Sequence, residues 1–122
     1  MLNLFSCNDP DSALSQMVDT SDPVFVYNHR WDRPDRAQLF AERFFPNYPG
    51  ARVLLMGQSP LVRRLFLKAE PTLKIEPVRD FRQAIERAEG GTLVGLGNTR
   101  GEAHKMIEYL EDAGEYNSPL RG

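Results

Sequence analysis

The sequence predicts an α/β fold in which a mostly parallel sheet of about five strands is flanked by helices, in a Rossmann-like arrangement. One two-part unit recurs five times: a short apolar or β-branched run, then a helix-capping residue and an amphipathic helical pattern. Connections that contain a helix are long enough to join parallel strands. A chain of 122 residues suits one core, so we expect residues 1–122 to form a single domain.

The first two units begin with predicted strands at residues 2–7 and 24–27. After the first strand, Asp9 can cap a helix and Pro10 fits the first helical position. The second helix is predicted to begin at Pro34. Its apolar residues recur at helical spacing and are Ala37, Phe40, Ala41 and Phe44.

The third and fourth units begin with predicted strands at residues 53–56 and 73–75. The third strand runs into Gly57-Gln58-Ser59-Pro60, again a cap followed by proline. The apolar residues of the next helix are predicted to be Leu61, Leu65, Phe66 and Ala69. In the fourth unit Asp80 can cap a helix whose apolar residues are Phe81, Ala84, Ile85 and Ala88.

The fifth unit combines a predicted strand at residues 92–94 with a glycine-rich loop at residues 95–101. The helix that follows carries Ala103, Met106, Ile107 and Leu110 on one side, and Thr99 with Glu102 fits a capping box. Backbone N–H groups around Gly95 and Gly97 could therefore bind a phosphate or carboxylate. A tight turn that binds nothing is the alternative, because short glycine motifs often occur by chance. A dinucleotide fingerprint is excluded, since the acidic residue expected about 20 positions later on a second strand is missing.

Composition excludes several classes of function. A net charge of −2 argues against nucleic acid as the main partner. Cys7 is the only cysteine, so no intrachain disulfide can form, and a reducing, cytoplasmic location is expected. No apolar run approaches the roughly 18 residues of a membrane span. No metal-ligand spacing, P-loop or nucleophile-and-base pair is present, so we expect no metal site and no catalytic residue.

The predicted topology gathers three polar loops at one edge of the sheet, because right-handed crossovers bring every strand-to-helix loop to that edge. These loops are residues 8–9, 28–33 and 98–100. They supply arginines, carboxylates and amides, a set that suits phosphate and an amino acid better than a metal ion.

Three segments in matching order carry a resemblance to a known family: residues 5–12 (FSCNDPDS), 28–36 (NHRWDRPDR) and 95–101 (GLGNTRG). The chain resembles the C-terminal domain of poly-γ-glutamate synthases, members of the Mur ligase superfamily. The first segment looks like the N-D-P-x-S counterpart of the superfamily motif D-Y-A-H-N-P-D-S. Asn8 stands in the histidine position of that motif, and Asp9-Pro10 stands in the Asn-Pro position.

The resemblance implies a Mur-ligase-type C-terminal domain that closes over an ATP-binding central domain. In that family ATP, with Mg²⁺, converts a carboxylate into an acyl phosphate, which the amine of an incoming amino acid attacks. Carried over to this sequence, the contacts to ATP and acyl phosphate would come from Asn8, Asp9 and Asn98. Contacts to glutamate or the closed interface would come from Asn28, Arg30, Asp32 and Arg33, with Gly95 and Gly97 as loop backbone.

The sequence departs from the complete enzymes because it lacks their P-loop, magnesium ligands and central domain. We expect an excised domain or a separate subunit that is inactive alone, rather than a relative that has lost the chemistry. The implied partners are an ATP-binding domain or subunit and glutamate, with a homo-oligomer or membrane-bound synthase subunits as further options. The alternative function is a non-catalytic α/β module that binds a small anion or a partner chain.

Overall fold

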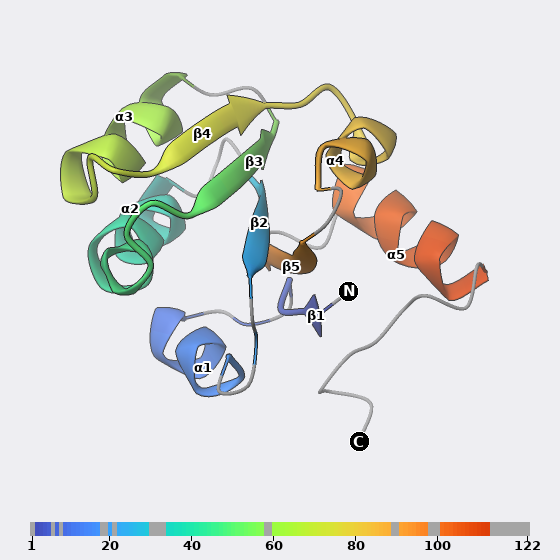
Figure 1. Cartoon of the computed structure of the whole chain (residues 1–122), viewed down its shortest axis with the longest axis horizontal. Coiled ribbons are helices and arrows are strands. Elements are labelled where there is room, and N and C mark those ends of the chain that lie inside the picture. The colour runs from blue at the N-terminus through green and yellow to red at the C-terminus, as the bar shows by residue number, and fades with distance from the viewer. Residues whose placement is uncertain are drawn as a thin grey trace.

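The computed structural model describes residues 2–5, 7, 9–17, 20, 22–29, 34–57, 60–88, 91–97 and 101–112. Within these residues the strands are β1 (Leu2–Asn3), β2 (Pro23–Asn28), β3 (Arg52–Met56), β4 (Lys74–Pro77) and β5 (Thr92–Gly97). They form one five-stranded sheet in the order β1-β5-β2-β3-β4, and every pair is parallel. The predicted fold class is therefore confirmed (Figure 1).

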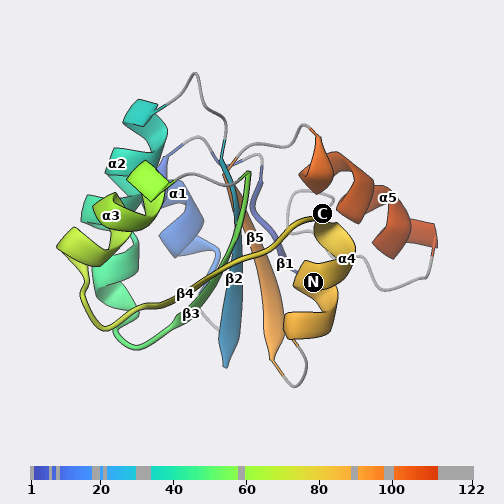
Figure 2. The same cartoon turned by 90° about the horizontal axis from the view of Figure 1, so that it is seen from above.

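Helices cover both faces of the sheet. They are α1 (Pro10–Ser15), α2 (Pro34–Arg43), the 3₁₀ helix η1 (Phe45–Asn47), α3 (Pro60–Ala69), α4 (Phe81–Arg87) and α5 (Glu102–Asp112). Figure 2 shows α1, α2 and α3 on one side of the sheet and α4 and α5 on the other. The split follows from strand order: the chain crosses the sheet one way from β1 to β4 and returns to β5. Right-handed crossovers in opposite directions place their helices on opposite faces.

The core under α1, α2 and α3 is rich in aromatic residues. The Phe25 ring lies edge-on to Phe44, with ring centroids 5.2 Å apart, and Tyr27 packs edge-on against Phe66 at 5.1 Å. Burial strongly raises the pKa of the Tyr27 hydroxyl, which therefore stays neutral. Edge-to-face contacts between aromatic rings add to the free energy gained by burying them.

The core under α4 and α5 is mostly aliphatic, apart from the buried ring of Phe5, and is built from smaller side chains. Val24, Val26, Leu54 and Met56 of the sheet pack there against Ala84, Ala103, Met106 and Leu110 of the helices. Because the strand residues alternate between the two cores, the sheet is buried on both faces, as expected of a parallel sheet. No helix among the described residues is long and apolar enough to cross a membrane.

The predicted helix caps at Asp9 and Asp80 are confirmed, whereas those predicted at residues 59 and 99 lie outside the described residues. Asp9 accepts a hydrogen bond from the Ser12 amide at 2.8 Å, and Asp80 accepts one from the Gln83 amide at 2.9 Å. In α3, however, Leu61 is 56% exposed, and Val62 is buried with Phe66. Val62 and Phe66 are four residues apart and face the sheet together, which turns Leu61 towards solvent.

The first strand is shorter than predicted and ends at Asn3 rather than at residue 7. The Asn3 side chain accepts a hydrogen bond from the Phe5 amide at 3.0 Å, and the Cys7 amide donates to the Leu4 carbonyl at 3.0 Å. These local bonds replace the sheet ladder and turn the chain towards α1.

The structure corrects the placement of Gly95, which was predicted to lie in a loop. Gly95 lies inside β5, in register with Val26 on β2 and Asn3 on β1, and its carbonyl accepts from the Leu4 amide at 2.9 Å. A Cβ atom at residue 95 would lie only 2.3 Å from Cε2 of Phe5. Glycine is therefore needed here because the buried Phe5 ring fills the space of a side chain.

We expect Gly95→Ala to lower the free energy of unfolding by about 1 to 3 kcal/mol, since the added methyl overpacks the core against Phe5. The measurement is urea unfolding of the single variants Gly95→Ala and Phe5→Leu and of the double variant. The smaller leucine should relieve the clash, so the double variant should be more stable than the sum of the single effects predicts. Strictly additive effects would contradict this packing account.

Candidate functional site

The strand order creates a point of divergence at the carboxyl ends of β1, β5 and β2. The chain leaves β1 and β2 towards α1 and α2 on one face, whereas it leaves β5 towards α5 on the other face. Neighbouring strands whose connections diverge in this way leave a crevice at their carboxyl ends, where ligands of open α/β sheets bind. The three predicted polar loops follow these three adjacent strands.

Asn28 lies at the centre of this edge. It is the last residue of β2, in register with Gly97 on β5 and with Met56 on β3. It is only 7% exposed and ends a strand whose preceding residues, Val24 to Tyr27, are apolar or aromatic. The structure therefore places this predicted site residue, a buried polar group, where β2 opens into the loop at residues 28–33.

Two glycines at the ends of the neighbouring strands allow close backbone contacts with the end of β2. Gly97 has φ +92°, and a Cβ atom there would lie 2.5 Å from the Asn28 carbonyl oxygen. Gly57, directly after β3, has φ +88°, and a Cβ atom there would lie 2.8 Å from the His29 carbonyl oxygen. The His29 amide in turn donates to the Met56 carbonyl at 3.2 Å. A side chain at either glycine would be both strained and obstructed, so the close approach requires glycine.

Gly57 was not among the predicted site residues. The sequence signal was present, because a glycine follows the third strand much as Gly97 ends the fifth. Periodicity alone does not reveal that these two strands flank the same neighbour, so the pairing of the two glycines across β2 emerges only from the strand order.

Asp9 acts as the N-terminal cap of α1. Its two carboxylate oxygens accept from the Ser12 amide at 2.8 Å and from the Ser12 hydroxyl at 2.9 Å. The Ser12 amide, followed by the Ser12 hydroxyl, lowers the pKa of Asp9. The carboxylate is therefore charged near neutral pH, and it orients the start of α1 beside the candidate site.

Cys7 lies two residues before this cap and is buried. Burial, followed by the negative charge of Asp9, raises the pKa of its thiol. The thiol stays protonated near neutral pH, which makes it a poor nucleophile. Cys7 is therefore part of the packing beside the site.

The remaining predicted site residues, Asn8, Arg30, Asp32, Arg33 and Asn98, lie outside the described residues, and their roles stay predictions. In the described part of the chain, no group of three or more histidine, cysteine, aspartate or glutamate side chains could hold a metal ion.

We expect Gly97→Ala to destabilise the fold more than Gly101→Ala. Both glycines have positive φ, but a Cβ atom at Gly101 would meet nothing within 4 Å. Gly101→Ala should therefore cost about 1 kcal/mol from backbone strain alone, whereas Gly97→Ala must also displace the Asn28 carbonyl. If urea unfolding showed that both variants lose the same free energy of unfolding, the contact between β5 and the end of β2 would not be close.

The cap at Asp9 makes stability depend on acid pH. Because folding lowers the pKa of Asp9, its contribution is complete above its ordinary value of about 3.9 and is lost as the pH falls through the lower folded value. Asp9→Asn keeps a capping side chain without a titrating group. Urea unfolding between about pH 6 and pH 2.5 should show a smaller loss of stability in Asp9→Asn than in the unmodified chain. If the free energy of unfolding fell equally with pH in both proteins, the Asp9 cap would not be the source of the pH dependence.

Comparison with known proteins identifies the family of the chain. The family model described as "Poly-gamma-glutamate synthase CapB C-terminal domain" matches residues 1–113. A similar curated protein is PGA synthase CapB of Bacillus subtilis (strain 168), which is 27% identical over 127 residues. The match covers 91% of this chain but only 32% of that protein, so the chain spans about a third of its relative's length. No solved structure matches the chain. The family match over nearly the whole chain shows that it belongs to the CapB C-terminal domain family of the poly-γ-glutamate synthases.

Proposed function

We propose that this chain forms one side of the active site of an ATP-dependent amide ligase that adds glutamate to a growing γ-glutamyl chain. The observation that carries the proposal is the meeting of β1, β5 and β2 at a diverging edge, in a member of the CapB C-terminal domain family. An ATP-binding domain or subunit would complete the site. The chain alone would then bind ATP weakly and turn none over, because it has no P-loop.

The proposed reaction has two steps of the kind used by Mur ligases. The γ-phosphoryl group of ATP passes to the terminal carboxylate of the acceptor, giving ADP and an acyl phosphate. The amine of glutamate then attacks the acyl carbon, phosphate leaves, and the amine loses a proton. Bound Mg²⁺ would screen the phosphate charges.

Each polar residue at the carboxyl edge would bind the part of the substrates that suits its charge. Arg30 and Arg33 suit the carboxylates of the incoming glutamate, since a guanidinium can grip a carboxylate with two parallel hydrogen bonds. Asp32 suits its ammonium group. The amide side chains of Asn8 and Asn98 can donate to phosphate oxygens, and the backbone beyond Gly97 can add N–H donors.

Asp9 and Asn28 fit positioning better than direct contact with phosphate. The charged Asp9 carboxylate would repel phosphate, and its hydrogen bonds to Ser12 instead orient the start of α1. Asn28, buried between β5 and β3, would set the start of the arginine-bearing loop. Closure against the ATP-binding partner would exclude water and so protect the acyl phosphate from hydrolysis.

The setting of the reaction follows from the same proposal. A ligase that consumes ATP and glutamate would work in the cytoplasm, where both are supplied, and membrane-bound synthase subunits could then receive the polymer. Self-association would bring several copies of the site together on one polymer.

Arg30→Ala should reduce ligase activity at least about tenfold, because losing a charged hydrogen bond costs about 1.5 to 3 kcal/mol. The assay combines the chain with an ATP-binding CapB portion and measures glutamate-dependent ADP release. Arg43→Ala is the matched control, since Arg43 is exposed in the last turn of α2, whereas Arg30 precedes the first turn of that helix in sequence. Equal activity of the two variants would contradict the role of Arg30, and rapid ATP turnover by the chain alone would contradict the need for a partner.

A further inference from the structure

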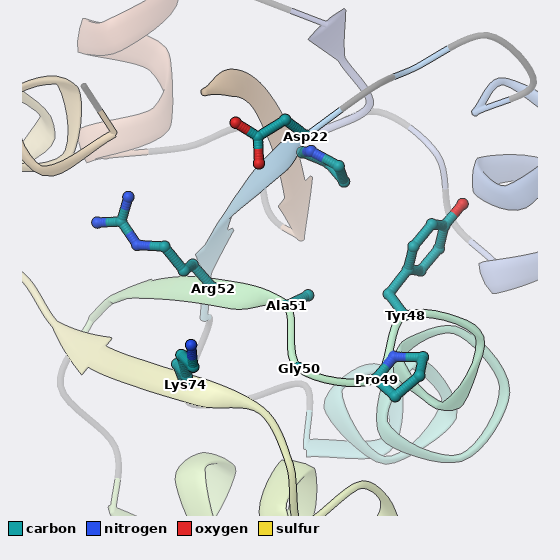
Figure 3. Close-up of a pocket in the computed structure, with 8 residues that line it drawn as sticks. Asp22, Tyr48, Pro49, Gly50, Ala51, Arg52 and Lys74 are labelled. Carbon is teal, nitrogen blue, oxygen red and sulfur yellow. The ribbon is translucent and has the colours of Figure 1, made fainter. Parts of the chain in front are cut away.

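A second pocket lies at the opposite edge of the sheet, at the amino ends of β2, β3 and β4. It has a volume of about 330 Å³ and is lined by Asp22, Pro23, Tyr48, Pro49, Gly50, Ala51, Arg52 and Lys74 (Figure 3). This volume is at the lower end of the range for small-molecule sites. The candidate ligase site, at the carboxyl ends of the strands, does not account for it.

The floor of the pocket is fixed by backbone hydrogen bonds. The Ala51 amide donates to the Tyr48 carbonyl at 3.1 Å, the Gly50 amide donates to the Thr72 hydroxyl at 2.9 Å, and the Lys74 amide donates to the Ala51 carbonyl at 2.9 Å. On one side the Tyr48 ring packs against Phe25, with ring centroids 5.1 Å apart. The pocket is therefore preformed on the rigid core.

Two cations stand side by side in this pocket. Arg52 and Lys74 are the first residues of β3 and β4, and they are in register across the two parallel strands. The Arg52 guanidinium also donates to the Arg87 carbonyl at the end of α4. That bond uses one of its five N–H groups and holds the side chain in place.

One carboxylate stands across the opening. Asp22 precedes β2, and Figure 3 shows it across the pocket from Arg52 and Lys74. Its backbone is in the left-handed region, with φ 49°, and its carbonyl accepts from the Thr92 amide at 3.0 Å. Non-glycine residues in that region are uncommon and gather at functional sites. The lining thus carries two positive charges and one negative charge, in a chain with a net charge of −2.

We propose that this pocket binds a small acidic amino acid, whose two carboxylates meet Arg52 and Lys74 and whose ammonium group meets Asp22. The ligand's charges mirror those of the lining. A dicarboxylate without an amine leaves Asp22 facing carboxylates, and a simple amine would face two cations. The proposal does not rest on the ligase function, since it concerns the other edge of the sheet.

The test is a titration of the ¹⁵N-labelled chain with L-glutamate, followed by the amide resonances in NMR spectra. Binding should shift the amides of Gly50, Arg52 and Lys74 in a saturable way at ligand concentrations up to about 20 mM, whether or not the amide of Gly97 at the candidate ligase edge also shifts. Sodium chloride at equal ionic strength is the control for screening. The proposal is overturned by the absence of shifts, by equal shifts in sodium chloride, or by shifts only at the candidate ligase edge.

Two variants test the assigned charges. Lys74→Gln should weaken glutamate binding about fivefold, whereas Lys68→Gln, which removes an exposed lysine at the end of α3, should not change it. Asp22→Asn tolerates the left-handed backbone but removes the negative charge, so the preference for glutamate over glutarate should disappear. Unchanged affinity in Lys74→Gln, or an unchanged preference in Asp22→Asn, would overturn the assignment.

Discussion

Strand β5 can lie between β1 and β2 only because glycine occupies the positions where atoms of neighbouring residues approach its backbone most closely. Within β5 a Cβ atom would lie 2.3 Å from the Phe5 ring at Gly95 and 2.5 Å from the Asn28 carbonyl oxygen at Gly97. At Gly91, directly before β5, it would lie 2.5 Å from a methyl group of Val24. Each of these contacts is too short for a real side chain. The rest of the architecture depends on this close fit, because β5 is the last strand in the sequence and pairs in register with strands on both sides.

The central place of β5 determines where chemistry can occur. The connection into β5 crosses the sheet in the direction opposite to the earlier crossovers, so α4 and α5 cover the second face. The carboxyl ends of β1, β5 and β2 consequently diverge, and the polar segments that follow them start from adjacent strands. At the other edge, the starts of β3 and β4 carry Arg52 and Lys74, which gives the same sheet a second, differently charged surface.

Local patterns were sufficient to predict most elements of the fold. The five strand-and-helix units, the caps at Asp9 and Asp80, and the apolar residues of α2 and α5 depend on neighbours in sequence, and such signals are readable. The resemblance to poly-γ-glutamate synthases depended on short motifs and agrees with the family match.

Features that depend on contacts distant in sequence could not be predicted. Gly95 was placed in a loop because glycine weakens an isolated strand, and only the Phe5 ring explains its position in β5. The pairing of Gly57 with Gly97 across β2, and the pocket at Asp22, Arg52 and Lys74, both require the strand order. Of the residues predicted for the carboxyl-edge site, Asp9, Asn28 and Gly97 lie at or beside that edge, and their roles stay predictions. The remaining predicted residues lie outside the described part of the chain.

We propose that the carboxyl ends of β1, β5 and β2 form the face that meets the ATP-binding partner. Hydrogen–deuterium exchange of the chain, alone and with an ATP-binding CapB portion, nucleotide and glutamate, tests it most directly. We expect new protection in peptides that span residues 8–12, 28–33 and 97–101, with little change at residues 48–52. Protection confined to residues 48–52 or to the outer surfaces of α4 and α5 would contradict it.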